Sequence, residues 1–187
     1  MNQLKRGEYF GHHYKKSTFE NIIITDTEYT HDRVDWHYHE NPYFTHLLQG
    51  KLYEANKKED HYLEPGALLF HNWQDAHHNI KAPEYTRGFH VELNSAWFEK
   101  YDVATTTLEG SLHLKNPLLK KLMNTIFLES QIADMHSQTN IDLLLLEVMS
   151  TMKHQETIQI AKKPKWANDL NGLITETTTN YSLTELS

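Results

Sequence analysis

The sequence contains no cysteine, so it can form neither a disulfide framework nor a metal site built on thiolates. Glycine and proline are also scarce, with 7 and 5 in 187 residues, so the composition is not that of a disordered tail. The N-terminus lacks the apolar core of a signal peptide, and no run approaches the roughly 18 apolar residues of a membrane span. We therefore expect a soluble, cytoplasmic protein without a membrane partner.

The motifs of several enzyme classes are missing as well. There is no Gly-x-Ser-x-Gly nucleophile elbow and no glycine-rich phosphate loop, and the adjacent carboxylates Glu59 and Asp60 fall in a polar loop. The formal net charge of -7 has the wrong sign for a domain that neutralises nucleic-acid phosphates. The sequence therefore predicts no catalytic residue and no DNA-binding residue in this chain, and we expect that it is not an enzyme.

Short strands separated by turns are predicted between about residues 21 and 94. This segment has β-branched and aromatic runs but no long 3.6-residue period, with turn signals at Gly50 and Pro65-Gly66. The predicted strands are Ile22–Thr25, Tyr43–Leu48, Leu52–Glu54, Ala67–Phe70 and Gly88–Leu93. In the last strand Phe89, Val91 and Leu93 alternate with polar residues, a pattern typical of one buried face.

Two helices that form an antiparallel pair are predicted after the strands. Asn116 is a good capping residue, and Pro117 favours the first helical position. A polar break at Ser137–Asn140 separates the two helices. The apolar face of the first helix comprises Leu118, Leu119, Leu122, Met123, Ile126 and Phe127, and that of the second comprises Ile141, Leu144, Leu145, Val148, Met149 and Met152.

The C-terminal residues predict a helix that has only begun. Trp166, Leu170, Leu173 and Ile174 have helical spacing, the run Thr177–Asn180 ends that helix, and Ser182–Glu185 has the form of a capping box. A helix of so few residues is not stable by itself, because nucleation costs more than one turn returns. We expect that the natural chain continues beyond Ser187; the alternative is a frayed tail.

The segment around His37 and His39 resembles the first motif of the cupin superfamily. At positions i and i+2 of a strand, the two rings point to the same face. The family motif places His-x-His before an acidic residue and a glycine, and here Tyr43 stands at the acidic position while Gly50 is in register.

The second cupin motif is matched by Gly66 and His77 at the expected separation. Asn72 and Gln74 replace the proline and glycine of its turn. The resemblance covers roughly residues 20–94 and implies a small cupin-like β-barrel, a double-stranded β-helix, whose inward histidines line a cavity. The fold class expected is therefore mainly β plus α, with the barrel followed by the helix pair and a truncated helical segment.

The resemblance leaves two roles open for the cavity. In the first, which we favour, polar groups contact a small-molecule effector and no cofactor is required. The ligand-binding residues would then be His37, His39, Tyr43, Trp73 and His77, although Trp73 is also a candidate core residue. In the second, the neutral imidazoles of His37, His39 and His77 bind a divalent metal such as Zn, Fe or Ni. Tyr43 is a poor substitute for the acidic ligand.

Residues 164–187 resemble the start of the AraC-type DNA-binding domain. In that family a first helix bearing a tryptophan is followed by a Ser-Leu-x-x-Leu-Ala element that opens the first helix-turn-helix, and here Ser187 stands where alanine is usual. The resemblance implies a cupin-like sensor barrel with an N-terminal arm at 1–100, a helical dimerisation region at 101–160, and a linker with the start of the truncated helix-turn-helix domain at 161–187.

We therefore expect the ligand-sensing and dimerisation portion of a bacterial transcription regulator. An effector in the barrel would modulate a DNA-binding domain that contacts promoter DNA, and a second copy of the chain would be the partner. The dimer contacts expected, shared with the intrachain core, are Leu118, Leu122, Ile126, Leu145 and Met149. The alternatives are a metal-dependent cupin oxygenase or isomerase that uses the three histidines, and a purely structural dimerisation domain with a filled barrel.

Overall fold

The computed structural model describes residues 1–104 and 110–162, with side chains described as far as Lys153. The chain divides into a unit from Met1 to Val148 and a second unit from Met149 to Ser187. Both sheets and the candidate site belong to the first unit. The predicted linker and helix-turn-helix start lie outside the described residues from 163 onwards.

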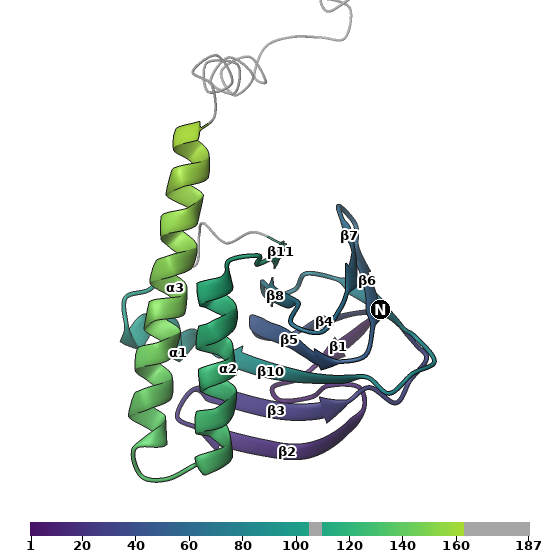
Figure 1. The fold of residues 1–187 in the computed structure, drawn as a ribbon, viewed down its shortest axis with the longest axis horizontal. Coiled ribbons are helices and arrows are strands. Elements are labelled where there is room, and N and C mark those ends of the chain that lie inside the picture. Colours follow the sequence, from purple (N-terminus) through teal and green to yellow (C-terminus); the bar gives the residue numbers. More distant parts are fainter. Residues whose placement is uncertain (105–109, 163–187) are drawn as a thin grey trace, which may run out of the picture. The chain divides into compact units, whose positions relative to one another are not determined.

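The strands form two sheets (Figure 1). The six-stranded sheet has the order β11-β8-β5-β10-β3-β2, and the five-stranded sheet has the order β1-β4-β9-β6-β7. The strands of the first are β2 (His12–Phe19), β3 (Ile22–Glu28), β5 (Tyr43–Gln49), β8 (Leu68–His71), β10 (Arg87–Leu93) and β11 (Ser111–His113). Those of the second are β1 (Asn2–Leu4), β4 (Arg33–His39), β6 (Leu52–Asn56), β7 (Asp60–Leu63) and β9 (His77–Lys81).

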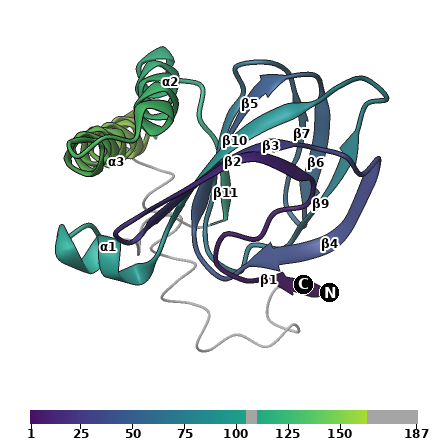
Figure 2. The same ribbon diagram turned by 90° about the horizontal axis from the view of Figure 1, so that it is seen from below.

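The two sheets lie face to face (Figure 2). Within the described residues no strand of one sheet pairs with a strand of the other, so the fold is a β-sandwich and closure into a barrel is not seen. The expectation of a mainly β fold with a few helices is confirmed. One half of the interior is apolar and contains Leu47, Leu52, Leu63, Ala67 and Leu69, with Tyr29 packed against them.

The six-stranded sheet is buried on both faces, where alternation in β10 predicted a single buried face. Phe89, Val91 and Leu93 are each 0% exposed, and His90 and Glu92 are each 2% exposed. Phe89 contacts a helix residue, Phe127, with ring centroids 5.1 Å apart, whereas His90 is hydrogen-bonded to Thr25 on β3. Helices therefore cover one face of this sheet, and the opposite face lines the interior of the sandwich.

The helices begin where local capping chemistry is available. These are α1 (Ser95–Lys100), α2 (Pro117–Ile132) and α3 (Ser137–Lys162). Asn116 Oδ1 accepts a hydrogen bond from the Leu118 N–H at 2.9 Å, and Pro117 occupies the first turn, as predicted. The break between α2 and α3 precedes the predicted one: Ala133 adopts a left-handed conformation, and Asp134 Oδ1 accepts from the Ser137 N–H at 3.1 Å. Residues 137–140 are therefore the first turn of α3.

Polar contacts tie these helices to the strands and to one another. His46 on β5 donates from Nε2 to Asn124 Oδ1 on α2 at 3.1 Å. The indole Nε1 of Trp97, a fully buried residue of α1, donates to Asp142 Oδ1 on α3 at 2.8 Å. In the part of the chain that the structure describes, no helix has the length and continuous apolar character needed to cross a lipid bilayer.

The residues expected at a dimer interface differ in their burial within a single chain. Leu122, Ile126 and Leu145 are 6%, 0% and 0% exposed, whereas Leu118 is 42% exposed. Met149 is 5% exposed and belongs to the second unit. Leu122, Ile126 and Leu145 are therefore core residues of one chain, and their role in a dimer stays a prediction.

A truncation of Ile126 tests this assignment to the intrachain core. We expect Ile126→Ala to lower the free energy of unfolding by about 2–5 kcal/mol, because it leaves a cavity between α2 and the sheet. Leu118→Ala, at a partly exposed position of the same helix, is the matched control and should cost less than about 1 kcal/mol. Urea unfolding followed by circular dichroism measures both. A loss in Ile126→Ala that appears only at high protein concentration would contradict the assignment, since it would identify a dimer contact instead.

Candidate functional site

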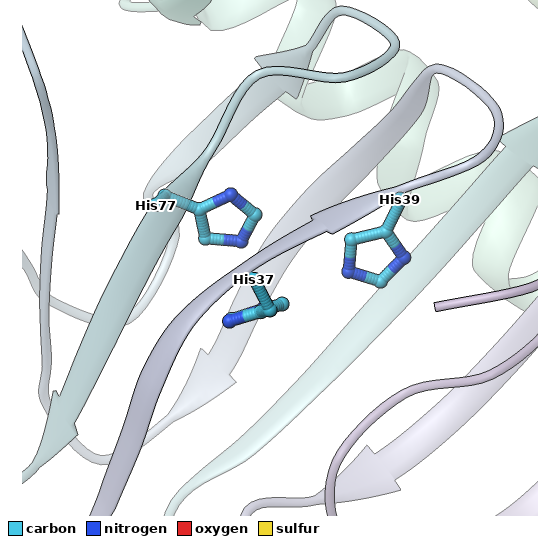
Figure 3. A group of neighbouring side chains, drawn as sticks. All are labelled: His37, His39 and His77. Carbon is cyan, nitrogen blue, oxygen red and sulfur yellow. The ribbon is translucent and has the colours of Figure 1, made fainter. Parts of the chain in front are cut away.

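Three histidines meet on the inner face of the five-stranded sheet. His37 on β4 lies directly opposite His77 on β9, and His39 follows two residues later on the same face of β4 (Figure 3). The ring centroid of His77 lies 4.3 Å from that of His37 and 5.9 Å from that of His39. The pattern His37-x-His39, with His77 from the second motif, is thus brought together as predicted.

Backbone carbonyls determine the tautomers of two of these rings. His37 Nδ1 lies 2.9 Å from the carbonyl oxygen of Asp35, and His77 Nδ1 lies 3.0 Å from that of Asp75. A carbonyl only accepts hydrogen bonds, so each Nδ1 carries the hydrogen and each Nε2 keeps its lone pair. Metal-binding histidines commonly have this outer contact, which holds the ring and leaves the other nitrogen as ligand.

Burial keeps the imidazoles neutral. It lowers the pKa of His37 to about 4 and lowers the pKa of His77, and it holds the pKa of His39 well below the ordinary value near 6.5. Neighbouring histidines act in the same direction, since a second positive charge nearby is unfavourable. Neutral imidazole is the form that binds a metal ion, so these rings are in the correct protonation state at neutral pH.

Tyr43, at the position where the cupin motif has an acidic residue, is a hydrogen-bond donor. Its hydroxyl donates to His77 Nε2 at 3.0 Å, since that nitrogen carries no hydrogen. Burial raises the pKa of this phenol well above its ordinary value, with the nearby Glu54 carboxylate acting in the same direction. Tyr43 therefore lies beside the three histidines as predicted, but as a neutral phenol rather than as an anionic ligand.

Glu54 and His71 also belong to this cluster, although sequence reasoning assigned them no role. Glu54 Oε1 lies 3.5 Å from His71 Nε2, and the His71 ring is 4.9 Å from that of His77. Both residues are nearly fully buried. The spacing of two between Leu52 and Glu54 indicates that both side chains lie on the same face of the strand. Nothing else in the sequence indicated a buried carboxylate at Glu54.

The space among these side chains has the size of an ion or one water molecule. The cavity has a volume of about 30 Å³, close to the share of one water in the liquid. Its lining includes His37, His39, Tyr43, Glu54 and His77.

Trp73 lies apart from the histidines, on a second and larger cavity. It is 57% exposed and follows Asn72 in a turn in which Gln74 takes a left-handed conformation, with φ of 61°, at the position of the motif's glycine. This cavity has a volume of about 540 Å³. It is lined by Glu40, Asn41, Pro42, Asn72, Trp73, Ser95, Phe98, Glu99, Asp102, Val103 and Ala104.

The three histidines fit a divalent metal ion. One ligand nitrogen from each of His37, His39 and His77 lies within 4.8 Å of the others, and tetrahedral zinc needs about 3.3 Å between ligand nitrogens, so a small adjustment suffices. Figure 3 shows one nitrogen of the His39 ring on the side toward His37 and His77, while its Nδ1 is buried without a hydrogen-bond partner among the described residues.

Solved structures similar to this chain include cupin proteins, all of low sequence identity. A cupin-2 domain protein from Shewanella frigidimarina NCIMB 400 is 16% identical, with a TM-score of 0.38 over 46% of this chain and 85% of its own. KdgF from Halomonas sp. is 13% identical, with a TM-score of 0.38 over 41% of this chain and 73% of its own. A cupin-like protein from Thermotoga maritima MSB8 is 15% identical, with a TM-score of 0.36 over 50% and 65%.

No protein-family model and no curated protein sequence matches the chain. The structural similarities are therefore similarities of fold, and they assign neither an activity nor a ligand to this protein.

Acid should destabilise the fold through its buried neutral histidines. His90, hydrogen-bonded to Thr25 and Tyr29, has its pKa lowered by burial to about 3, whereas in the unfolded chain it titrates near 6.5. Between these values only the unfolded state binds the proton, so the free energy of unfolding falls with pH by up to about 1.4 kcal/mol per pH unit. Glu54, with its pKa raised to about 7 by burial, acts in the opposite direction down to its unfolded value.

Urea unfolding at about pH 7 and about pH 5 measures this dependence. His90→Gln, whose amide can still bond both hydroxyls, should reduce the slope by up to about 1.4 kcal/mol per pH unit. An equal slope in the variant and the natural protein would show that His90 is not the neutral buried group described above.

Proposed function

We propose that this chain is the sensing portion of a DNA-binding transcription regulator of the AraC type, in which a small-molecule effector changes the conformation of α3. The resemblance of residues 164–187 to the start of an AraC-type domain supports the DNA-binding role. In this proposal the effector occupies the cavity beside Trp73, because its volume of about 540 Å³ is much larger than the space of about 30 Å³ among the histidines.

One observation carries this proposal: the helix that forms a wall of the larger cavity is hydrogen-bonded to α3. Phe98 and Glu99 of α1 line the cavity, and the preceding residue, Trp97, donates from its indole to Asp142 of α3 at 2.8 Å. Both partners are buried, so a shift of α1 that broke this bond would leave a buried polar group without a partner, which is unfavourable. A ligand that moves α1 would therefore bias the position of α3, the helix that leads toward the C-terminal residues.

The lining of the cavity favours an organic cation. Three acidic residues, Glu40, Glu99 and Asp102, line the cavity, and the lining residues that the structure describes include no lysine, arginine or histidine. The exposed indole of Trp73 and the buried ring of Phe98 provide apolar surface beside them. A ligand with an amino group and an aromatic or aliphatic body would pair with the first and pack against the second.

A second function, a metal-dependent cupin activity, is favoured by the tautomers of His37 and His77. Carbonyl contacts at both Nδ1 atoms leave both Nε2 atoms as acceptors beside one space, which His39 also borders; the Tyr43 hydroxyl donates to the Nε2 of His77 and would give way to an ion. A divalent ion bound there would supply Lewis-acid chemistry. His37, His39 and His77 would hold it, while Tyr43 would hold a proton beside it. An enzyme of this kind needs room for a substrate next to the ion, and for that reason we place the regulator first.

The ligand chemistry is tested with a matched pair of probes, 2-phenylethylamine and 2-phenylethanol. We expect the amine to bind, detected by calorimetry, and the alcohol to bind at least about tenfold more weakly, because it lacks the charge that the carboxylates recognise. Glu99→Gln should lower the affinity for the amine. Glu64→Gln, which replaces an exposed carboxylate beside Lys51, is the control and should leave this affinity unchanged. Equal affinities for the amine and the alcohol would contradict the cation assignment.

The regulatory role is tested on the full-length gene product with genomic fragments that it selects. Saturating amine should change the affinity for the selected DNA by about 5–150-fold, the usual size of allosteric coupling. Trp97→Phe removes the bond to Asp142 and should bring this ratio toward 1. Trp36→Phe, on β4 and half-exposed, is the matched control. Selection of no specific DNA by the full-length protein would overturn the regulator proposal.

A further inference from the structure

Glu54 and His71 face each other across a distance that no hydrogen bond explains. His71 Nε2 lies 3.5 Å from Glu54 Oε1, and this nitrogen is buried without a hydrogen-bond partner among the described residues. The other carboxylate oxygen, Oε2, accepts from Asn79 Nδ2 at 2.9 Å. The reason for the unpartnered nitrogen lies in the hydrogen bonds on the opposite side of the His71 ring.

A chain of hydrogen bonds determines the tautomer of His71. The Ser111 hydroxyl donates to Asp75 Oδ2, so Ser111 Oγ can only accept from His71 Nδ1, which lies 3.0 Å away. Nδ1 therefore carries the hydrogen, and in the neutral ring Nε2 carries a lone pair. When Glu54 is ionised, two electron-rich atoms, His71 Nε2 and Glu54 Oε1, face each other in the interior.

His77 presents a third lone pair to the same place. Its Nδ1 donates to the Asp75 carbonyl, so its Nε2 is an acceptor as well; this nitrogen accepts the Tyr43 hydroxyl, and an ion bound there would replace that hydrogen bond. One ligand atom from each of Glu54, His71 and His77 lies within 4.8 Å of the other two, and all three residues are buried. Two imidazoles and one carboxylate are a common ligand set for divalent transition metals.

We infer that Glu54, His71 and His77 form a second position for a divalent transition-metal ion, adjoining the three-histidine position and sharing His77 with it. The inference extends the metal-binding candidate function and does not depend on the regulator proposal. In this second position Glu54 on β6 provides a carboxylate ligand, which the first cupin motif would have placed at Tyr43 on β5.

The shared residue makes the two positions mutually exclusive. His77 Nε2 has a single lone pair, and its Nδ1 is committed to the Asp75 carbonyl, so His77 can bind only one ion at a time. The chain should therefore bind one ion, with two alternative ligand sets. The set that contains an ionised Glu54 contributes one negative charge, whereas the set of three histidines contributes none. Because the two sets share only His77, substitution of the other residues of one set leaves the second set able to bind an ion.

Cobalt(II) binding to the whole chain, stripped with a chelator and purified without a nickel column, tests the inference. The readouts are the metal-to-protein ratio and the visible absorption of bound cobalt. We expect one ion per chain in the natural protein and one in the His37→Ala/His39→Ala double variant, which keeps only the set with Glu54. Adding Glu54→Gln to the double variant should weaken cobalt binding at least about 100-fold, beyond the usual effect of losing an outer contact.

The Glu54→Gln variant should keep the fold, and the chain offers a matched control variant. Glu54→Gln has the shape of glutamate, and its amide can donate to His71 Nε2 while its oxygen accepts from Asn79, so the apo variant should fold, as circular dichroism would verify. Glu64→Gln, an exposed carboxylate, should leave cobalt binding unchanged.

The outcomes separate the two metal positions. If the double variant binds no cobalt while Glu54→Gln alone binds one ion as tightly as the natural protein, the position at Glu54 is overturned and the three-histidine position stands. If the natural protein binds no cobalt at all, both are overturned. In neither case do DNA or the amine enter the measurement, so the regulator proposal is judged separately.

Discussion

In the part of the chain that the structure describes, five imidazoles are buried between the two sheets, and keeping them neutral is the constraint on which the polar half of the interior depends; they belong to His37, His39, His71, His77 and His90. A charged ring in this environment would lose its hydration without a compensating partner. His37, His71 and His77 share one solution, in which Nδ1 donates to an oxygen and Nε2 is left as an acceptor. The interior is consequently lined with lone pairs instead of charges, an environment that favours a cation.

The apolar half of the sandwich stabilises the fold that contains this polar arrangement. The cluster around Leu47, Leu52 and Leu69 excludes water between the sheets, and its burial supplies the hydrophobic free energy that a polar interior does not provide. A second apolar layer, formed by Phe89 and the helices, covers the opposite face of the six-stranded sheet. Since β10 contributes to both layers, the histidine cluster and the helices rest on the same strand.

The two cavities described above differ in what they can bind. The space among the histidines is ion-sized and closed in by aromatic and polar side chains, whereas the space beside Trp73 is large enough for an organic molecule and is bordered by carboxylates. Only the second has a wall on α1, which is joined to α3 through Trp97. This separation explains why a single chain supports both a metal-binding and an effector-binding proposal.

The sequence by itself determined the features that depend on neighbours in the chain. The i, i+2 spacing of His37 and His39 placed both rings on one face, and Asn116-Pro117 began α2, because strand alternation and helix capping are local. It did not reveal β2, whose alternation of exposed and half-buried residues at a sheet edge has little apolar signal.

Only the tertiary structure decided what lies across the sandwich. Glu54, His71 and His77 come from β6, β8 and β9, and their meeting depends on strand order and on which face of each strand turns inward, where a shift by one residue reverses every side chain. The tertiary structure also separated Trp73 from the histidines. A turn whose Gln74 adopts a left-handed conformation carries the indole outward, and no pattern of residue types states that direction.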